Sequence, residues 1–377
     1  MVFDKKVIDF ASEPLFLGTG RNVSRLDLNV EQGIQKQTDD AIGKIWFAND
    51  FSYTQDGKDY ATMSQKLRNL YLKNLKFQTL LDSVASRTVV EVFIPITTNP
   101  QLESWWYQHA FFENNIHSKT YAEIIKVMPL DSKVVFDDIM INDNILSRAK
   151  EVTEVFNEAV LYNARMTLHN ANLPGVDVGY DLEEHQVMIV KSLYALNILE
   201  FILFKSSFLT SFAFKENGLM TATGDAIKKI QLDEIGHGAM STNLINRLRK
   251  DPQWIHIFAK IEKDVYKMYQ NAITADYAWI DYLFEEDVQL MGINSQVEKQ
   301  YVDYNAKIVM TSVGLEPFKA EVFNPCIWAN KYTKSSNVQT AQKEKDNANY
   351  LLGKLDTETS QEFWKGLDNV RNEDYRA

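Results

Sequence analysis

Apolar residues recur at three- and four-residue steps along most of this chain, which is the spacing of amphipathic α-helices. The clearest segment runs from Leu67 to Val84, and its inward face carries Tyr71, Leu75, Gln78 and Asp82. Similar helical segments are expected at about 100–127, 144–168, 183–214, 223–249 and 254–291, after an irregular arm over residues 1 to about 30. The sequence Asn172-Leu-Pro-Gly175 marks a loop. The pattern therefore predicts an all-α protein.

The composition supports one large helical domain. No Pro/Gly/Ser-rich linker divides the first 330 residues, and only 15 Gly and 8 Pro occur in 377 residues, which leaves room for long helices. Hydrophobic residues make up 45% of the chain, enough for a substantial core. After Trp328 the chain becomes polar, with few apolar residues. We therefore expect a helical domain over residues 1–332 and a flexible C-terminal tail over residues 333–377.

The charge and the cysteine content limit the partners that this protein is expected to bind and the cellular compartment in which it is expected. The net charge of −11 argues against a nucleic-acid partner, because proteins that bind phosphate backbones usually carry a basic stripe. Cys326 is the only cysteine and cannot form an internal disulfide, which fits a reducing compartment. The first ten residues contain Asp4 and Asp9 and lack the order of a signal peptide, and no apolar run reaches roughly 18 residues. These features predict a soluble cytoplasmic protein with no membrane contact.

Glu200 is the residue from which the chemistry can be argued. It lies in the apolar helical run from Leu199 to Phe204, where an unpaired carboxylate would cost several kcal/mol or be forced neutral. The chain offers a matching set of candidate metal ligands, namely Asp82, Glu113, His117, Glu200, Glu234 and His237. Two carboxylates from two helices, with two carboxylate-and-histidine pairs from two more, form the ligand set of a two-metal centre in a four-helix bundle. The predicted fold is a ferritin-like four-helix bundle core with additional helices.

The residue types suit iron or manganese. Carboxylates neutralise the cations and can bridge them, and neutral imidazole supplies nitrogen ligands. One carboxylate-and-histidine pair alone is weak evidence because such pairs are common on exposed helices. Two pairs, each preceded by a carboxylate in an apolar helical segment, favour the metal centre.

The other histidines have no such context. We predict that His185 lies on a solvated face, and that His109, His169 and His256 have core or surface roles. Tyr121 lies one helical turn after His117 and hence beside the proposed metals, although on its own it would be an ordinary core tyrosine.

Four segments, residues 74–83, 116–121, 197–200 and 233–237, strongly resemble the small subunit of class I ribonucleotide reductase. The resemblance spans almost the whole chain. It includes Glu13-Pro-Leu-Phe-Leu-Gly18 near the start, and Asn324-Pro-Cys-Ile-Trp328, residues 337–339 and residues 350–353 near the end. This ordered set is more specific than any single motif.

The resemblance implies a homodimer in which a two-metal cluster oxidises a nearby tyrosine to a stable radical. Tyr121 matches that tyrosine, and Phe204, Phe208 and Ile230 match its apolar surroundings. The expected cofactor is two iron ions per chain, with manganese or a mixed pair as alternatives. In the family the radical is passed to a large catalytic subunit, which converts ribonucleotides to deoxyribonucleotides.

The resemblance also implies a route for radical transfer. Trp46, Asp233 and His117 match the inner relay, and Tyr350 matches the tail tyrosine that connects to the large subunit. Asp233 also suits the carboxylate that orients a metal-bound imidazole. In the tail, Glu344 matches an acidic residue associated with subunit communication, and the candidate docking anchors are Phe363, Trp364 and Leu367.

The sequence departs from the family pattern before His117. The family has a glutamate three residues before its first histidine, whereas position 114 is Asn here and the glutamate is Glu113. The flanking segments match in registers that differ by one residue, so one residue is inserted among Phe112–Asn115. A helix commonly absorbs such an insertion as a π-type turn, which we predict near residues 112–116. Glu113 is then the favoured ligand, and Asn114 as a neutral oxygen ligand, or an empty position, is the alternative.

Two other functions remain open at this level. A ferritin-like iron-binding or storage protein would use the same bundle and ligands. The polar tail with Tyr350 and the surroundings of Tyr121 argue against it. A two-metal oxygenase acting on a small apolar substrate would need a substrate pocket, which a sequence cannot display.

Overall fold

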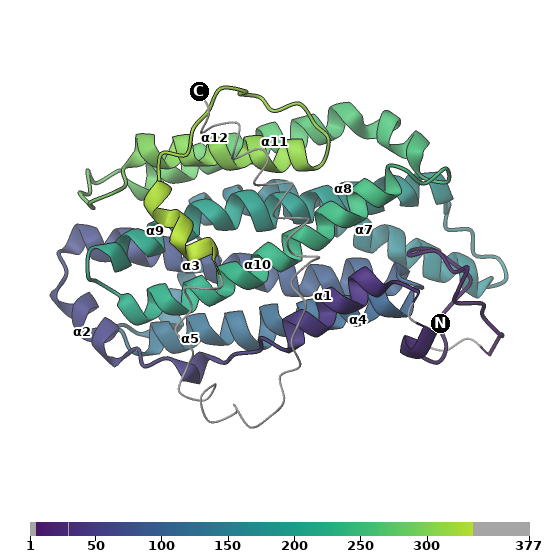
Figure 1. The fold of residues 1–377 in the computed structure, drawn as a ribbon, viewed down its shortest axis with the longest axis horizontal. Coiled ribbons are helices and arrows are strands. Elements are labelled where there is room, and N and C mark those ends of the chain that lie inside the picture. Colours follow the sequence, from purple (N-terminus) through teal and green to yellow (C-terminus); the bar gives the residue numbers. More distant parts are fainter. Residues whose placement is uncertain (1–4, 29, 335–377) are drawn as a thin grey trace.

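The helices of the computed structural model, which describes residues 5–28 and 30–334, run mostly along one direction (Figure 1). The described α-helices are α1 (Gln32–Ile42), α2 (Thr54–Thr62), α3 (Gln65–Thr88), α4 (Pro100–Phe111), α5 (Ser118–Lys126), α6 (Ser132–Ile139), α7 (Asp143–Ala171), α8 (Leu182–Ile198), α9 (Phe204–Glu216), α10 (Thr221–Leu248), α11 (Ile255–Leu283) and α12 (Ser295–Ser312). Across the described ranges there is no β-strand, and pairing is limited to isolated bridges. The all-α prediction is confirmed.

Three π-helical turns widen the helices without interrupting them. They are η3 (Val89–Phe93), η5 (Phe112–His117) and η6 (Leu199–Leu203). At the end of η5 the Ser118 N–H donates to the Glu113 carbonyl, five residues back, which is the π-helical pattern. Because η5 and η6 join their flanking helices, α4–η5–α5 and α8–η6–α9 are each one long element. The π-type turn predicted near residues 112–116 is confirmed.

The bundle that concerns the site consists of α3, α4–η5–α5, α8–η6–α9 and α10. Helix α10 packs against α8 and α9, and α3 packs against α9, α5 and η5. The other helices cover this bundle: α7 and α11 pack on α8, α12 packs on α11 and η6, and α1 packs on α4. In the view of Figure 1, α11 and α12 form the upper layer and α1, α4 and α5 the lower one, so α3, α8 and α10 are enclosed between them.

The run from Leu182 to Glu216 is the one described helical stretch long and apolar enough to cross a membrane by length and composition. Within its most apolar window, 89% is buried inside the protein. The apolar character of this run is therefore that of a central core helix. The expectation that no apolar run reaches this length was too strict, because Lys191, Glu200 and Lys205 are few among many apolar neighbours.

Helix boundaries agree with the sequence pattern except near the end of the described chain. The predicted segment 254–291 is too long, because α11 ends at Leu283 and the chain turns at Asp287 and Gly292, which have φ of 51° and 95°. Helices α2, α6 and α12 lie outside the predicted segments. The loop at 172–175 is confirmed, since α7 ends at Ala171 and Asn172 adopts the left-handed conformation.

Candidate metal centre

The structure brings all six predicted metal ligands together in the interior of the bundle. They form two overlapping groups whose potential ligand atoms lie within 4.8 Å of one another. One group is Asp82, Glu113, His117 and Glu234, and the other is His109, Glu113, Glu200 and His237. None of these side chains is more than 2% exposed. Glu113 belongs to both groups and so lies between two potential cation sites.

The first group surrounds the Nδ1 atom of His117. This nitrogen lies 3.0 Å from Asp82 Oδ1 and 3.1 Å from Glu234 Oε1. Glu113 Oε2 is 3.5 Å away. The carboxylates come from α3, η5 and α10, so three separate elements converge on one imidazole nitrogen.

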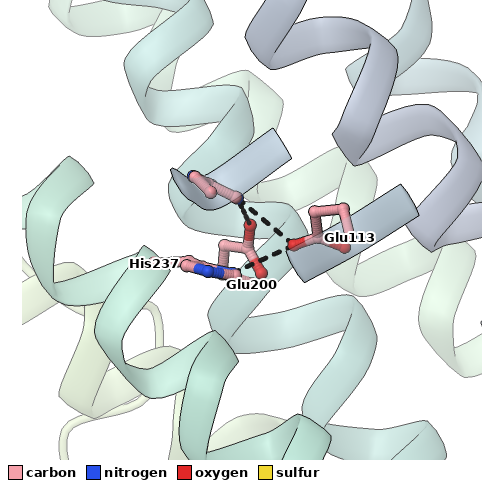
Figure 2. A group of neighbouring side chains, drawn as sticks. Glu113, Glu200 and His237 are labelled. Atoms are coloured by element: carbon pink, nitrogen blue, oxygen red, sulfur yellow. Dashed lines mark ion pairs between the residues drawn. The ribbon is translucent and has the colours of Figure 1, made fainter. Parts of the chain in front are cut away.

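The second group is centred on Glu113 Oε1. Figure 2 shows Glu113, Glu200 and His237 pointing toward one another from different helices. His237 Nδ1 lies 2.9 Å from Glu113 Oε1 and 2.6 Å from Glu234 Oε2. Glu234 thus faces both histidines, with Oε1 toward His117 and Oε2 toward His237. Glu113 and Glu234 are therefore placed to bridge two cations.

His109, for which a core or surface role was predicted, is fully buried and also belongs to the second group. Its Nε2 lies 3.2 Å from Glu113 Oε1 and 3.4 Å from Glu200 Oε1. Its ring stacks on that of His237 with centroids 3.6 Å apart and planes inclined by 15°. The signal was present in the sequence, because His109, Glu113 and His117 are spaced by four residues.

The inserted residue is accommodated so that Glu113, and not Asn114, faces the centre. Glu113 is fully buried, whereas Asn114 and Asn115 are exposed. In a regular α-helix each four-residue step drifts by about 40° around the axis, and a π-turn reduces that drift. The alternative in which Asn114 supplies a ligand oxygen is wrong for this structure.

The donor set fits two divalent cations. Within the described part of the chain, several buried oxygens have no hydrogen-bond partner, including Asp82 Oδ2, Glu234 Oε1 and both carboxylate oxygens of Glu113 and Glu200. Buried carboxylate oxygens left unpaired are costly, so a compensating positive charge is required. Four carboxylates, those of Asp82, Glu113, Glu200 and Glu234, together balance the charge of two divalent metals.

Burial shifts the pKa values of side chains in this cluster. Burial, and then the charges of Glu234 and Glu113, raise the pKa of Glu200 well above its usual value. Burial and the neighbouring His237 lower the pKa of His109 to about 3. His109 is therefore a neutral imidazole at physiological pH, which is the form that binds a metal.

His185 does not lie on a solvated face, as was predicted, but is fully buried. Its Nε2 is 2.9 Å from Asn163 Oδ1, and its Nδ1 is 3.1 Å from the Tyr180 hydroxyl. Glu183 and Glu184 begin α8 at the surface, and the next residue already faces inward. His169 and His256 are exposed.

Trp46 and Asp233, two of the residues predicted for radical transfer, lie next to the ligand set. Trp46 Nε1–H donates to Asp233 Oδ2 at 2.7 Å, and the same oxygen lies 3.1 Å from His117 Nε2. The His117 ring therefore has Asp233 on one nitrogen and the carboxylates of the first group on the other. Tyr121 is fully buried, and its hydroxyl has no hydrogen-bond partner in the described part of the chain.

Some of the other predicted residues are described in the structure, and some are not. Phe204, Phe208 and Ile230 are fully buried, and the first two stack with centroids 5.2 Å apart. Their contact with Tyr121 stays a prediction. Tyr350, Glu344 and the docking anchors Phe363, Trp364 and Leu367 lie outside the described residues.

Comparison with known proteins gives one consistent family. Residues 30–325 match the family model described as ribonucleotide reductase, small chain. The chain is 32% identical to the ribonucleoside-diphosphate reductase subunit beta of Haemophilus influenzae, over 94% of this chain and 96% of that protein. It is 33% identical to ribonucleoside-diphosphate reductase 1 subunit beta of Escherichia coli O157:H7, with the same coverage. The solved structure of the ribonucleotide reductase R2 subunit from Clostridium botulinum has a TM-score of 0.74 at 22% identity, covering 89% of this chain and 98% of that one. Its likeness confirms the ferritin-like fold.

Proposed function

Since the chain belongs to the ribonucleotide reductase small chain family, we propose that it holds a two-metal cofactor and uses it to form a radical on Tyr121 for a separate large subunit. The relatives are small subunits of ribonucleoside-diphosphate reductase, which favours this function over a ferritin-like iron-binding protein. The observation that carries the proposal is the pair of overlapping ligand groups joined by Glu113. The resulting enzyme acts only together with its large subunit.

Asp82, Glu113, His117 and Glu234 would hold one metal, and Glu113, Glu200, Glu234 and His237 the other. We propose two iron ions, with manganese or a mixed pair as the alternatives. Bound there and oxidised by molecular oxygen, the metals would supply the oxidant that takes one electron from a nearby side chain. The unpaired carboxylate oxygens described above support this assignment, because two divalent cations would neutralise them without further protons.

Tyr121 suits the storage of a radical because the protein excludes water from it. Burial, followed by the charges of Asp82 and Glu234, raises the pKa of Tyr121 well above its usual value. The phenol therefore keeps its proton until the electron leaves, and the proton must then find an acceptor. Asp82 Oδ2 is buried and has no hydrogen-bond partner among residues 5–28 and 30–334, and we propose that it receives this proton.

Trp46, Asp233 and His117 would connect the centre to the surface. Asp233 Oδ2 accepts from Trp46 Nε1–H and faces His117 Nε2, so one carboxylate oxygen joins the two rings. The rings themselves are stacked, with centroids 6.1 Å apart. This arrangement also fixes His117 with Nδ1 toward the metal, since Nε2–H donates to Asp233.

The assembly and the compartment complete the proposal. We propose a homodimer in the cytoplasm that docks on the large subunit through residues 333–377, with Tyr350 continuing the transfer route. A helical domain over residues 1–332 would then carry the metal centre.

A frozen-solution electron paramagnetic resonance spectrum tests the function. The metal-loaded, oxygen-exposed protein should show a tyrosyl signal that Tyr121→Phe abolishes while its metal content stays unchanged. Tyr71→Phe is the matched control, because Tyr71 is also buried but donates its hydroxyl proton to Thr223 and has no predicted radical role. An undiminished signal in Tyr121→Phe would rule out the assignment.

A further inference from the structure

We propose that His109 is an additional metal ligand, so that the metal held by Glu113, Glu200 and His237 has two imidazole ligands instead of one. The proposal rests on the two-metal centre and adds a ligand to it. His109 is the one member of the second group that the six-residue set does not include.

The position of the His109 ring is the first argument. Its Nε2 is 3.2 Å from Glu113 Oε1 and 3.4 Å from Glu200 Oε1, on two different helical elements. The same Glu113 oxygen is 2.9 Å from His237 Nδ1. One imidazole nitrogen thus faces the same space as the carboxylates and the second imidazole.

The ring nitrogens of His109 also lack another interaction that would explain their burial. His109 is fully buried, and neither ring nitrogen has a hydrogen-bond partner among the described residues. The short distances to Glu113 and Glu200 do not have hydrogen-bond geometry. A fully buried imidazole with both nitrogens unpaired is costly unless a ligand compensates it.

The spacing of His109 along its helix also supports a ligand role. His109, Glu113 and His117 are separated by two four-residue steps, and η5 lies across the second of them. The widened turn brings all three side chains to one side of one helix, where Glu113 contacts both histidines. The inserted residue thus allows one helix to supply ligands to both cations.

A neutral imidazole adds a donor without changing the charge of the site. Nitrogen ligands favour iron over manganese relative to carboxylate oxygens, in keeping with the general order of divalent affinities. The second cation position should therefore prefer iron more strongly than the first, which has one imidazole.

The test compares His109→Phe with wild type. Phenylalanine keeps a flat ring to stack on His237 but has no nitrogen. His185→Gln is the matched control, because it also removes a fully buried imidazole, away from the centre. Chelator competition with iron(II) should show a loss of affinity at one site of His109→Phe of at least about 10-fold, since the loss of even a supporting residue weakens metal sites 10–100-fold. From an equimolar mixture of iron(II) and manganese(II), this variant should take up less iron than wild type.

X-ray absorption of the iron-loaded wild type gives a readout that does not depend on any variant. We expect scattering from three imidazoles shared by two metals. An imidazole count of two, or unchanged affinities and metal ratio in His109→Phe, would overturn the proposal while leaving the two-metal centre in place. A wild-type protein that binds no pair of metals would overturn both.

Discussion

Replacing Arg148 with methionine should remove a buried cation on which the geometry around Glu200 depends. Arg148 lies on α7, is 1% exposed, and forms an ion pair with Asp276 of α11. Its Nη2–H also donates to the carbonyl of Leu203, the last residue of η6, at 2.8 Å. The guanidinium lies 3.7 Å from the centroid of the Phe77 ring. Arg148 thus supplies a donor to the widened turn that carries Glu200.

The loss of stability in Arg148→Met follows from the Asp276 carboxylate, which the substitution leaves without its cation. Methionine fills much of the volume, but Asp276 stays fully buried, and in the described structure only Ser206 Oγ–H then donates to it, at 3.1 Å. Removing one partner of a buried ion pair costs about 3–5 kcal/mol, a large share of the roughly 5–15 kcal/mol that stabilises a protein domain. Replacing both partners, in Arg148→Met/Asp276→Leu, should recover most of this loss, because no charge is then left unpaired.

The loss should also depend on pH. Burial already raises the pKa of Asp276 in the folded wild type, against the lowering effect of Arg148, and the variant removes that opposition. Asp276 then binds a proton more tightly in the folded than in the unfolded state, so stability falls as pH rises above the unfolded pKa.

Urea unfolding at fixed protein concentration measures the free energy of unfolding of Arg148→Met and of wild type at each pH. We expect the difference between the two proteins to be larger at pH 8 than at pH 5. A loss below about 1 kcal/mol at both pH values, or a double variant no more stable than the single one, would refute the reasoning.

Two further predictions concern residues near the centre. Burial raises the pKa of Glu298 from 4.5 to about 8, so the folded state binds the extra proton and wild-type stability should fall as pH rises through that window. Glu298→Gln should flatten the slope by up to about 1.4 kcal/mol per pH unit in urea unfolding, and an unchanged slope would contradict this. Gly238→Ala places a methyl 2.5 Å from the ring of Phe201, the neighbour of Glu200, and should cost about 1–3 kcal/mol and weaken metal binding. Gly33→Ala is the control, because nothing lies within 4 Å of its added methyl. Equal effects of the two glycine substitutions would exclude a role for the Phe201 contact.

Helical periodicity was sufficient to predict the bundle, and buried carboxylates indicated six candidate ligands, which the structure brings together. Asp82 and Glu200 stand out because each interrupts an apolar face, and a local physical cost is visible in a single sequence. The π-turn at Phe112–His117 was also predictable, since a one-residue insertion between two matching flanks leaves few ways to keep the helix continuous.

Features that depend on distant partners could not be predicted. Arg148 and Asp276 belong to helices far apart in sequence, and nothing in either local segment indicates the other. His185 follows two exposed glutamates, and its burial depends on Asn163 and Tyr180. His109 is different, because its spacing to Glu113 was visible, but a lone histidine four residues from a carboxylate is too common to be informative without the fold.

We propose that α3, α4–η5–α5, α8–η6–α9 and α10 enclose a centre that holds two metal ions. Anomalous diffraction at the iron edge from crystals of the iron-loaded full chain tests it most directly. We expect two metal peaks per chain, one beside Asp82 and His117 and the other beside Glu200 and His237, with the Glu113 carboxylate between them. A single peak, or peaks away from these side chains, would contradict it.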